Sequence, residues 1–333
     1  SSWNTFIRSI NDDLKYELVA LRTRARDLAQ NDPLMKKFLS MCEENVVGAQ
    51  GFQLQCKAFD EKGLDSEANS TIERHWNKWS EKLCDIRRRN NLPALERTIV
   101  RTLARDGEAL IRHIIDTDSM NPYGYTIQVI DPSRLSEKCE DLGNNTKIIN
   151  GIEIDEYGRC LAYYLYKDKC VNGAETIRIP ASEITHIFIE ETPGQLRGIP
   201  WAHAVMVRLN VLKKYIEFTL QASAIGASSM GFFVKTDNST DSLSDEDEDG
   251  DGVILQNAEG GSFGVLPDGY DFRAWDPNNP SDVFTPFLKT IGQHVAAGLE
   301  VNYNCLTENL EGVSYSTIRA SILAERARWM KIQ

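Results

Sequence analysis

Residues 192–235, TPGQLRGIPWAHAVMVRLNVLKKYIEFTLQASAIGASSMGFFVK, decide how this chain is organised. The prolines and glycines that open the stretch oppose regular structure up to Pro200, which suits a first helical turn because it has no N–H to leave unpaired. Beyond it, apolar residues recur every three or four positions, as one buried helix face requires: Trp201, Val205, Leu209, Leu212, Ile216 and Leu220. The spacing predicts a helix from Pro200 to about Ser228, followed by a strand.

The same stretch resembles part of a known family. Its residues match the PGQxRGxP pattern, followed by a long helix, of lambda-type portal proteins of tailed bacteriophages: Pro193, Gly194, Gln195, Arg197, Gly198 and Pro200. Later blocks resemble the family in the same order. They are LPDG, PNNPSDVFTPF, AAGLEVNYNCLTENLEGVSYSTIRA, which contains Tyr315, Ser316 and Arg319, and LAERARWMKIQ. The opening LVALRTRARDLAQNDPLMKKFLSMCEENVVGAQGFQLQ is similar too, so the resemblance covers nearly all of the chain.

The composition is typical of a soluble folded protein with two or three domains, since 41% of the 333 residues are hydrophobic and 26% are charged. No apolar run is long enough to span a membrane, and no secretory signal is present. The seven cysteines are scattered and never spaced as C-x-x-C, which favours reduced thiols. No phosphate-binding GxxxxGK[ST] loop or dinucleotide motif occurs, so we expect no cofactor and no ATP-driven motor in this chain.

The formal net charge of −12 argues against a protein that grips nucleic acid, because affinity for DNA comes from cations that displace phosphate counterions. For a protein that forms a channel around DNA, negative charge is instead favourable. An acidic lining makes no ion pairs with passing phosphates, so a duplex stays centred and mobile. The acidic composition is therefore compatible with a sleeve through which DNA slides.

Before residue 108 the sequence predicts mainly helices. The capping-box pattern of Ser70 and Glu73 predicts a helix start, and the three arginines at 87–89 are interpreted as its solvated end. Gly107 is expected to end the next predicted helix, at 93–106. The predicted elements are helices at 6–31, 33–42, 70–89 and 93–106 and a strand at 52–56.

From residue 108 to 191 the pattern changes to short β-branched and aromatic runs, which predict a mainly antiparallel β-domain. The predicted strands are 109–115, 125–130, 148–154, 161–166, 176–179 and 184–189. After the long helix, short strands are predicted at 232–234, 253–255, 263–266 and 270–275. A second helix around 287–299, a polar segment at 302–312 and a last helix at 315–333 complete the prediction.

The resemblance implies an α+β portal subunit with a helical and β-rich wing, a two-helix stem, a small β-rich clip, a tunnel loop and a long helix behind it. It implies these boundaries: wing 1–195 (helices 1–107, β-domain 108–195), first stem helix 196–228, clip 229–285, second stem helix 286–300, tunnel loop 301–314 and long helix 315–333. Because the chain begins at Ser1 and stops within a helix, we expect it to be truncated at both ends.

Two motifs in the predicted clip invite catalytic interpretations. Residues 260–264 spell GGSFG, which matches the G-x-S-x-G nucleophile elbow around Ser262, but a strand is predicted after it and only His294 lies downstream. The acidic run begins like a calcium-binding EF-hand loop but lacks its final glutamate and its flanking helices. We interpret this run as a self-repelling loop that docks basic partner surfaces: Asp245, Glu246, Asp247, Glu248, Asp249 and Asp251.

The polar segment at 302–312 contains uncharged and acidic side chains but no lysine or arginine. A surface loop would have the same composition. The resemblance implies a channel-lining tunnel loop, whose polar groups exchange hydrogen bonds with successive phosphates without holding them. Its candidate residues are Asn302, Asn304, Thr307, Glu308, Asn309 and Glu311. The five histidines share no metal-ligand spacing, so we expect structural roles and no metal site: His75, His113, His186, His203 and His294.

The resulting hypothesis is a non-enzymatic portal subunit. Many copies, commonly twelve in the family, would form a ring at one capsid vertex through which double-stranded DNA is packaged and ejected. The implied partners are further copies of the chain, terminase, head-tail connector or adaptor proteins, and major capsid and scaffolding proteins, with no membrane. The implied location is the virion, and the host cytoplasm during assembly. The alternatives are a serine hydrolase at Ser262, a metal-dependent nuclease at the acidic run, and a monomeric adaptor.

Overall fold

The structure is a computed structural model that describes residues 8–61, 63–115, 120–167, 174–227, 231–235, 270–274 and 284–333. The chain divides into two compact units, Ser1–Asn210 with Ile291–Gln333, and Val211–Thr290. We describe each unit by itself. Among the described residues, no helix combines the length and the apolar composition that crossing a lipid bilayer requires.

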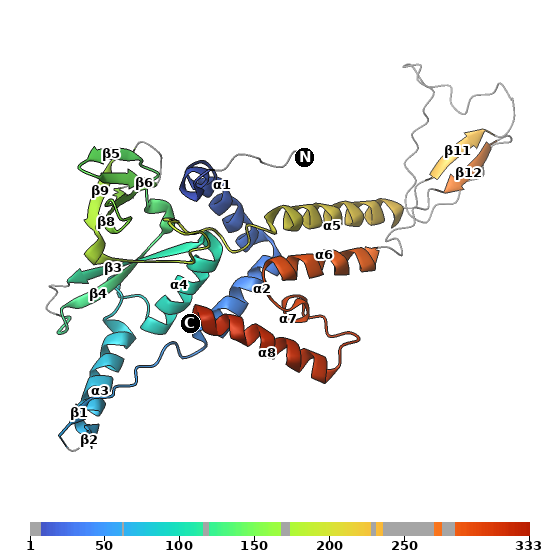
Figure 1. The fold of residues 1–333 in the computed structure, drawn as a ribbon. Helices are drawn as coiled ribbons and strands as arrows, with labels where there is room; N and C mark the ends of the chain where they lie inside the picture. Colours follow the sequence, from blue (N-terminus) through green and yellow to red (C-terminus); the bar gives the residue numbers. More distant parts are fainter. Residues whose placement is uncertain are drawn as a thin grey trace. The chain divides into compact units, whose positions relative to one another are not determined.

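Three helices of the first unit, coloured blue to teal in Figure 1, contribute buried side chains to its hydrophobic core. They are α1 (Ile10–Asn31), α2 (Pro33–Cys42) and α4 (Leu92–Asp106), and a π-helical turn, Glu43–Val47, follows α2. Asp32 caps α2 by accepting from the Met35 N–H, and Pro33 occupies its first turn, which is why this helix begins where it does. Met35, Phe38 and Leu39 are completely buried.

The predicted strand at 52–56 is wrong, and so is the predicted start of the next helix. The Phe52 and Cys56 N–H groups donate to the carboxylates of Glu96 and Glu73, so side chains replace a partner strand. The helix α3 spans Ser66–Lys82 and is capped by Asp65, which leaves Ser70 inside it. A short pair, β1 (Phe59–Asp60) and β2 (Gly63–Leu64), precedes α3.

The arginines at 87–89 lie beyond α3, so their assignment to a helix end is also wrong. They belong to a turn organised by Asp85, which is 1% exposed. Its carboxylate accepts from the backbone N–H groups of Arg87, Arg89 and Asn90. The side chain of Asp85 therefore supplies the acceptors that a helix would otherwise provide.

The β-rich part contains two antiparallel sheets, which confirms the predicted antiparallel β-region and the α+β class. One has the order β10-β3-β4, and the other the order β5-β6-β7-β8-β9. The bounds are β3 (Glu108–Ile115), β4 (Tyr125–Ile130), β5 (Glu140–Gly143), β6 (Thr146–Ile149), β7 (Ile152–Ile154), β8 (Cys160–Tyr166), β9 (Thr176–Pro180) and β10 (Ile184–Phe188). The predicted strand 148–154 is two strands, because Asn150 and Gly151 take positive φ and turn the chain, and β5 was not predicted.

The long helix α5 spans Met206–Ala227, so its predicted start at Pro200 is wrong. Turns occupy 201–205, where the His203 and Val205 N–H groups donate to carbonyls three residues earlier, at Pro200 and Ala202. The predicted face is buried at Val205, Leu209 and Leu212, whereas Leu220 is 64% exposed. The later helix α6 (Phe284–Gly298) confirms the second predicted long helix.

The end of α6 and the start of α5 join the core of the first unit. Val205 and Leu209 form one cluster with Val295 and Leu299, and Trp329 of α8 (Tyr315–Ile332) joins it. The polar segment contains a short helix, α7 (Tyr303–Thr307), that was not predicted. The last predicted helix is confirmed by α8, which Ser314 caps.

In the second unit, α5 and α6 lie side by side (Figure 1), and Tyr215 packs its ring on Phe284 and Phe287. The strands β11 (Gly231–Lys235) and β12 (Tyr270–Ala274) pair antiparallel, which confirms two of the four strands predicted here. The strands predicted at 253–255 and 263–266 lie outside the described residues.

Candidate functional site

The predicted motif around Arg197 converges on one buried carboxylate, that of Glu108. Glu108 is the first residue of β3 and is completely buried. Arg197 donates to both of its oxygens, at 3.0 and 3.1 Å, and Arg22 of α1 approaches Oε1 at 2.5 Å. His186 of β10 and the Gly198 N–H complete the contacts, at 3.1 and 2.9 Å. We call Arg22, Glu108, His186 and Arg197 the Glu108 cluster.

The pKa of Glu108 reflects two opposing effects. Burial acts to raise it, but Arg197, Arg22 and His186 together hold the pKa well below its ordinary value. The carboxylate is thus charged and fully hydrogen-bonded, and it has no proton to give as a general acid. The geometry is that of an ion-pair cluster that joins α1, β3, β10 and the segment before α5.

Arg197 and Gln195 also bind backbone groups. Arg197 donates to the carbonyls of Ser136 and Asn150 at 3.3 and 2.7 Å, and Gln195 donates to the Arg197 carbonyl at 2.8 Å. The side-chain amide oxygen of Gln195, Oε1, accepts from the Glu191 N–H at 3.1 Å. The two buried side chains therefore fix the path of the segment that leads to α5.

The two glycines of this motif serve different purposes. A Cβ on Gly198 would overlap the Gly107 carbonyl, and a Cβ on Gly107 would overlap the backbone of Ile199, so the two chain segments touch. Gly194 has open space around it but a φ of +80°, which a residue with a side chain rarely adopts. Gly198 is needed for close approach and Gly194 for backbone conformation.

The other predicted motif residues are not brought to the Glu108 cluster. Tyr315, Ser316 and Arg319 lie on the exposed start of α8, where Tyr315 is 80% exposed. The Ser316 hydroxyl is 2.9 Å from that of the capping residue Ser314. Their described contacts are local to the beginning of α8.

In the predicted tunnel loop, several polar side chains bond within the chain. Asn302 caps α7 by accepting from the Asn304 and Cys305 N–H groups at 2.8 and 3.3 Å. Thr307 donates its hydroxyl to the Tyr303 carbonyl at 2.8 Å.

The rest of this loop is more exposed. Glu308 has a φ of +55° and pairs with Lys37 of α2 at 2.6 Å, and Asn309 accepts from the Glu311 N–H at 2.9 Å. The predicted docking residues 245–251 and Ser262 lie outside the described residues.

Comparison with known proteins identifies the family. The family model for "Phage portal protein, lambda family" matches residues 1–333. The chain belongs to the lambda family of phage portal proteins. Its resemblance to that family, drawn from five ordered blocks, is thereby confirmed.

Named members of the portal family resemble this chain over most of its length. The "Probable portal protein" of Halomonas phage phiHAP-1 is 34% identical over 324 residues, which is 94% of this chain and 62% of that protein. "Portal protein B" of Escherichia phage lambda is 23% identical over 355 residues, 96% of this chain and 66% of that protein. The chain thus spans less than two thirds of these portal proteins.

Two solved structures share the fold of this chain. A chain in the "Neck of empty GTA particle computed with C6 symmetry" has a TM-score of 0.52 at 13% identity and aligns with 92% of this chain and 75% of its own length. A chain in the "Neck of native GTA particle computed with C12 symmetry" has a TM-score of 0.51 at 12% identity, with 94% and 80% covered. GTA denotes a gene transfer agent.

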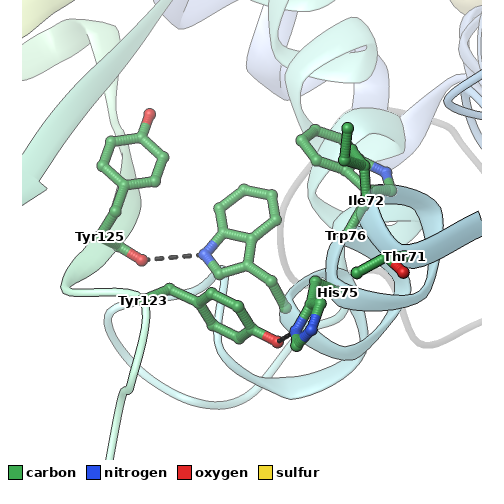
Figure 2. Close-up of a pocket in the computed structure, with 7 residues that line it drawn as sticks. Thr71, Ile72, His75, Trp76, Tyr123 and Tyr125 are labelled. Carbon is green, nitrogen blue, oxygen red and sulfur yellow. Dashed lines mark hydrogen bonds between the residues drawn. The ribbon is translucent and has the colours of Figure 1, made fainter. Parts of the chain in front are cut away.

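Sequence reasoning missed one surface feature of this portal chain, an aromatic recess of about 390 Å³ (Figure 2). Trp76 and Trp79 of α3 face Tyr123 and Tyr125, and the Trp79 ring stacks on Tyr125 with centroids 5.7 Å apart. The Trp79 indole N–H donates to the Tyr125 carbonyl at 2.9 Å. Of the two tryptophans, Trp79 is buried and Trp76 is partly exposed.

Proposed function

We propose that this chain is one subunit of a closed ring at a single capsid vertex, through which double-stranded DNA enters and leaves the capsid. The match of the lambda-family portal model to residues 1–333 carries the proposal. A head-to-tail contact repeated around an axis closes into a ring when the rotation fits, and the subunit then needs complementary faces.

Exposed apolar side chains support assembly. In the second unit, Val211, Phe218 and Leu220 of α5 are 56%, 65% and 64% exposed. In the first unit, Leu323 and Met330 of α8 are 55% and 67% exposed. Large side chains that a single chain leaves in water are suited to contacts with another copy.

In the proposed mechanism, the ring forms a channel that surrounds the DNA duplex without binding it tightly. The net charge of −12 favours repulsion between the ring lining and DNA phosphates, so that the duplex is guided without being held. The tunnel loop, with Asn304 and Glu311 among its partly or fully exposed residues, supplies transient hydrogen bonds to the moving backbone. We assign the regions 196–228 and 286–300 to the stem and 229–285 to the clip.

The acidic run at Asp245–Asp251 is proposed to dock basic surfaces of terminase and, later, of head-tail connector proteins. Capsid and scaffolding proteins would contact the ring during assembly in the host cytoplasm, and the finished ring stays in the virion. No covalent chemistry is assigned to the chain. Changing Ser262→Ala would therefore leave packaging intact, whereas Asp247→Asn with Asp249→Asn would weaken capture of terminase.

Sedimentation velocity of the purified chain tests the proposal. A ring subunit gives a discrete species many times the 37.6 kDa mass of one chain, present over a wide concentration range. A chain that stays single at every concentration contradicts the ring and supports the monomeric adaptor instead.

A further inference from the structure

A polar recess of about 240 Å³ lies where α1 and α4 meet the end of β4 in the first unit. Its wall consists of Arg26, Ala29, Gln30, Arg101, Arg105 and Asp131. We call it the arginine recess. Its volume is enough for several water molecules or for one small oxyanion with part of its hydration shell.

Carboxylates that do not line the recess hold its three guanidinium groups in fixed orientations. Asp106, which is completely buried, accepts from Arg26 Nε and Nη2 at 2.9 and 2.8 Å and from Arg105 Nε and Nη2 at 3.0 and 2.7 Å. Arg101 donates to Glu43 through Nη1 at 2.7 Å. Such pairing fixes the orientation of side chains that would otherwise lose considerable rotamer freedom on binding a ligand.

These pairs leave donors pointing to no acceptor. A guanidinium carries five N–H groups. Among the described residues, no acceptor bonds Nη1 of Arg26, Nη1 of Arg105, or Nε and Nη2 of Arg101. The three side chains are 30%, 27% and 35% exposed, so these donors belong to partly buried groups that line the recess.

The charges of the recess and its direct partners balance. The three arginines Arg26, Arg101 and Arg105 face three carboxylates, Glu43, Asp106 and Asp131. Three against three leaves no net negative charge at the recess, in a chain whose net charge is −12. Asp131 is the one carboxylate on the wall, and it is already bonded to Arg26 and to the Ser133 N–H.

We propose that the arginine recess binds a phosphate group, either free in solution or on a nucleic-acid backbone. Planar guanidinium groups match the geometry of phosphate oxygens, and three fixed around one recess offer the donors that are left over from the internal ion pairs. The bound anion accepts from these remaining donors and joins α1 to α4. All of the lining side chains come from one copy of the chain, so the site does not depend on ring formation.

Thermal unfolding of the purified chain in sodium phosphate, against sodium chloride at equal ionic strength, tests the site. At phosphate concentrations roughly tenfold above the dissociation constant, the melting temperature is expected to rise by about 2–4 °C, because a ligand that binds the folded state stabilises it. The variants Arg101→Gln and Gln30→Glu should each abolish the phosphate-specific rise. Gln30→Glu adds a negative charge to the wall and leaves every ion pair of the recess intact.

Arg24→Gln is the matched control, since Arg24 is exposed on the same helix as Arg26 and is absent from the wall. It should retain the full phosphate effect. The proposal is overturned if phosphate raises the melting temperature no more than chloride does, or if Arg101→Gln and Gln30→Glu keep the rise.

Binding of a short fluorescent DNA duplex, followed by anisotropy at low salt, identifies the source of the phosphate. If Arg101→Gln weakens duplex binding several-fold more than Arg24→Gln, the recess takes the nucleic-acid backbone. If the two variants behave alike while the phosphate stabilisation persists in the wild-type chain, the recess takes free phosphate. Ring formation is measured separately, so failure of the ring leaves this result interpretable.

Discussion

Glu108 receives donors from three distant parts of the chain, Arg22, His186 and the Arg197–Gly198 pair, and no water-exposed oxygen remains on it. Burying an ion pair gains little by itself, because desolvation offsets the attraction. Removing one partner is different, because the remaining charges stay buried without compensation. The cluster is therefore a determinant of how α1, β3 and the segment before α5 come together.

Replacing Glu108→Gln should lower the free energy of unfolding by about 3–5 kcal/mol, since Arg22 and Arg197 would remain buried without their counterion. Urea denaturation measures the change. The matched control is Glu183→Gln, which removes a partly exposed pair with Arg112 and should cost at most about 1 kcal/mol. Equal losses in the two variants would show that the Glu108 cluster has no special role.

Acid should destabilise the chain partly through Asp131. Burial acts to raise its pKa, but hydrogen bonds from Arg26 and Ser133 lower the pKa from 3.8 to about 2. A depressed carboxylate pKa adds stability above the unfolded value and loses it as pH falls toward the folded value. The stability difference between wild type and Asp131→Asn should therefore be constant above about pH 5 and shrink between about pH 4 and pH 2. A difference that grows on acidification would contradict this assignment.

At the scale of elements, the junction of α4, β3 and the motif segment depends on backbone contact between Gly107 and Gly198. Gly198→Ala should destabilise the chain by about 1–3 kcal/mol, because the new methyl group overlaps backbone that has no rotamer to change. Gly194→Ala, with open space but positive φ, should cost about 1–2 kcal/mol from conformation alone. Thermal unfolding of both variants compares them. An unchanged stability of Gly198→Ala would contradict the close approach.

Elements with local signals were predictable from sequence, whereas elements fixed by distant partners were not. The bounds of α2 were predicted correctly because Asp32 and Pro33 mark its start. Phe52–Cys56 has strand-like residues but bonds to Glu73 and Glu96 instead. The start of α5 was placed too early because residues 201–205 form turns with three-residue hydrogen bonds before the helix begins. The spacing of apolar residues does not distinguish these turns from a helix, and it does not reveal the tertiary bonds of 52–56.

The same limit applied to the sites. The family motif identified Arg197 as a structural residue. Its ion-pair partner Glu108 was not predictable, because 89 residues separate the two in the sequence. Arg101 and Arg105 of the arginine recess are four residues apart on α4, a spacing that was visible in the sequence, but Arg26 and Asp131 come from other elements. The predicted tunnel loop stays a prediction, and α7 within it depends on the Asn302 cap.

At the scale of the whole molecule, assembly into the proposed ring would cover apolar faces that a single chain leaves exposed. Phe218 in the second unit is 65% exposed, and Phe218→Asp should reduce the fraction of chain in the large sedimenting species by at least several-fold. Asn210→Asp changes the charge equally on an exposed position of the same helix and should leave assembly intact. Unchanged assembly in Phe218→Asp would exclude this side chain from the subunit contact.

In the proposed function, an acidic chain handles DNA as a repeated sleeve and does not grip the duplex inside the channel. Electron micrographs of the purified chain test that claim directly. We expect closed annuli with a central opening at least as wide as a DNA duplex, about 20 Å from the depths of its grooves and its backbone. Particles without a central opening, or with one too narrow for a duplex, would contradict the account.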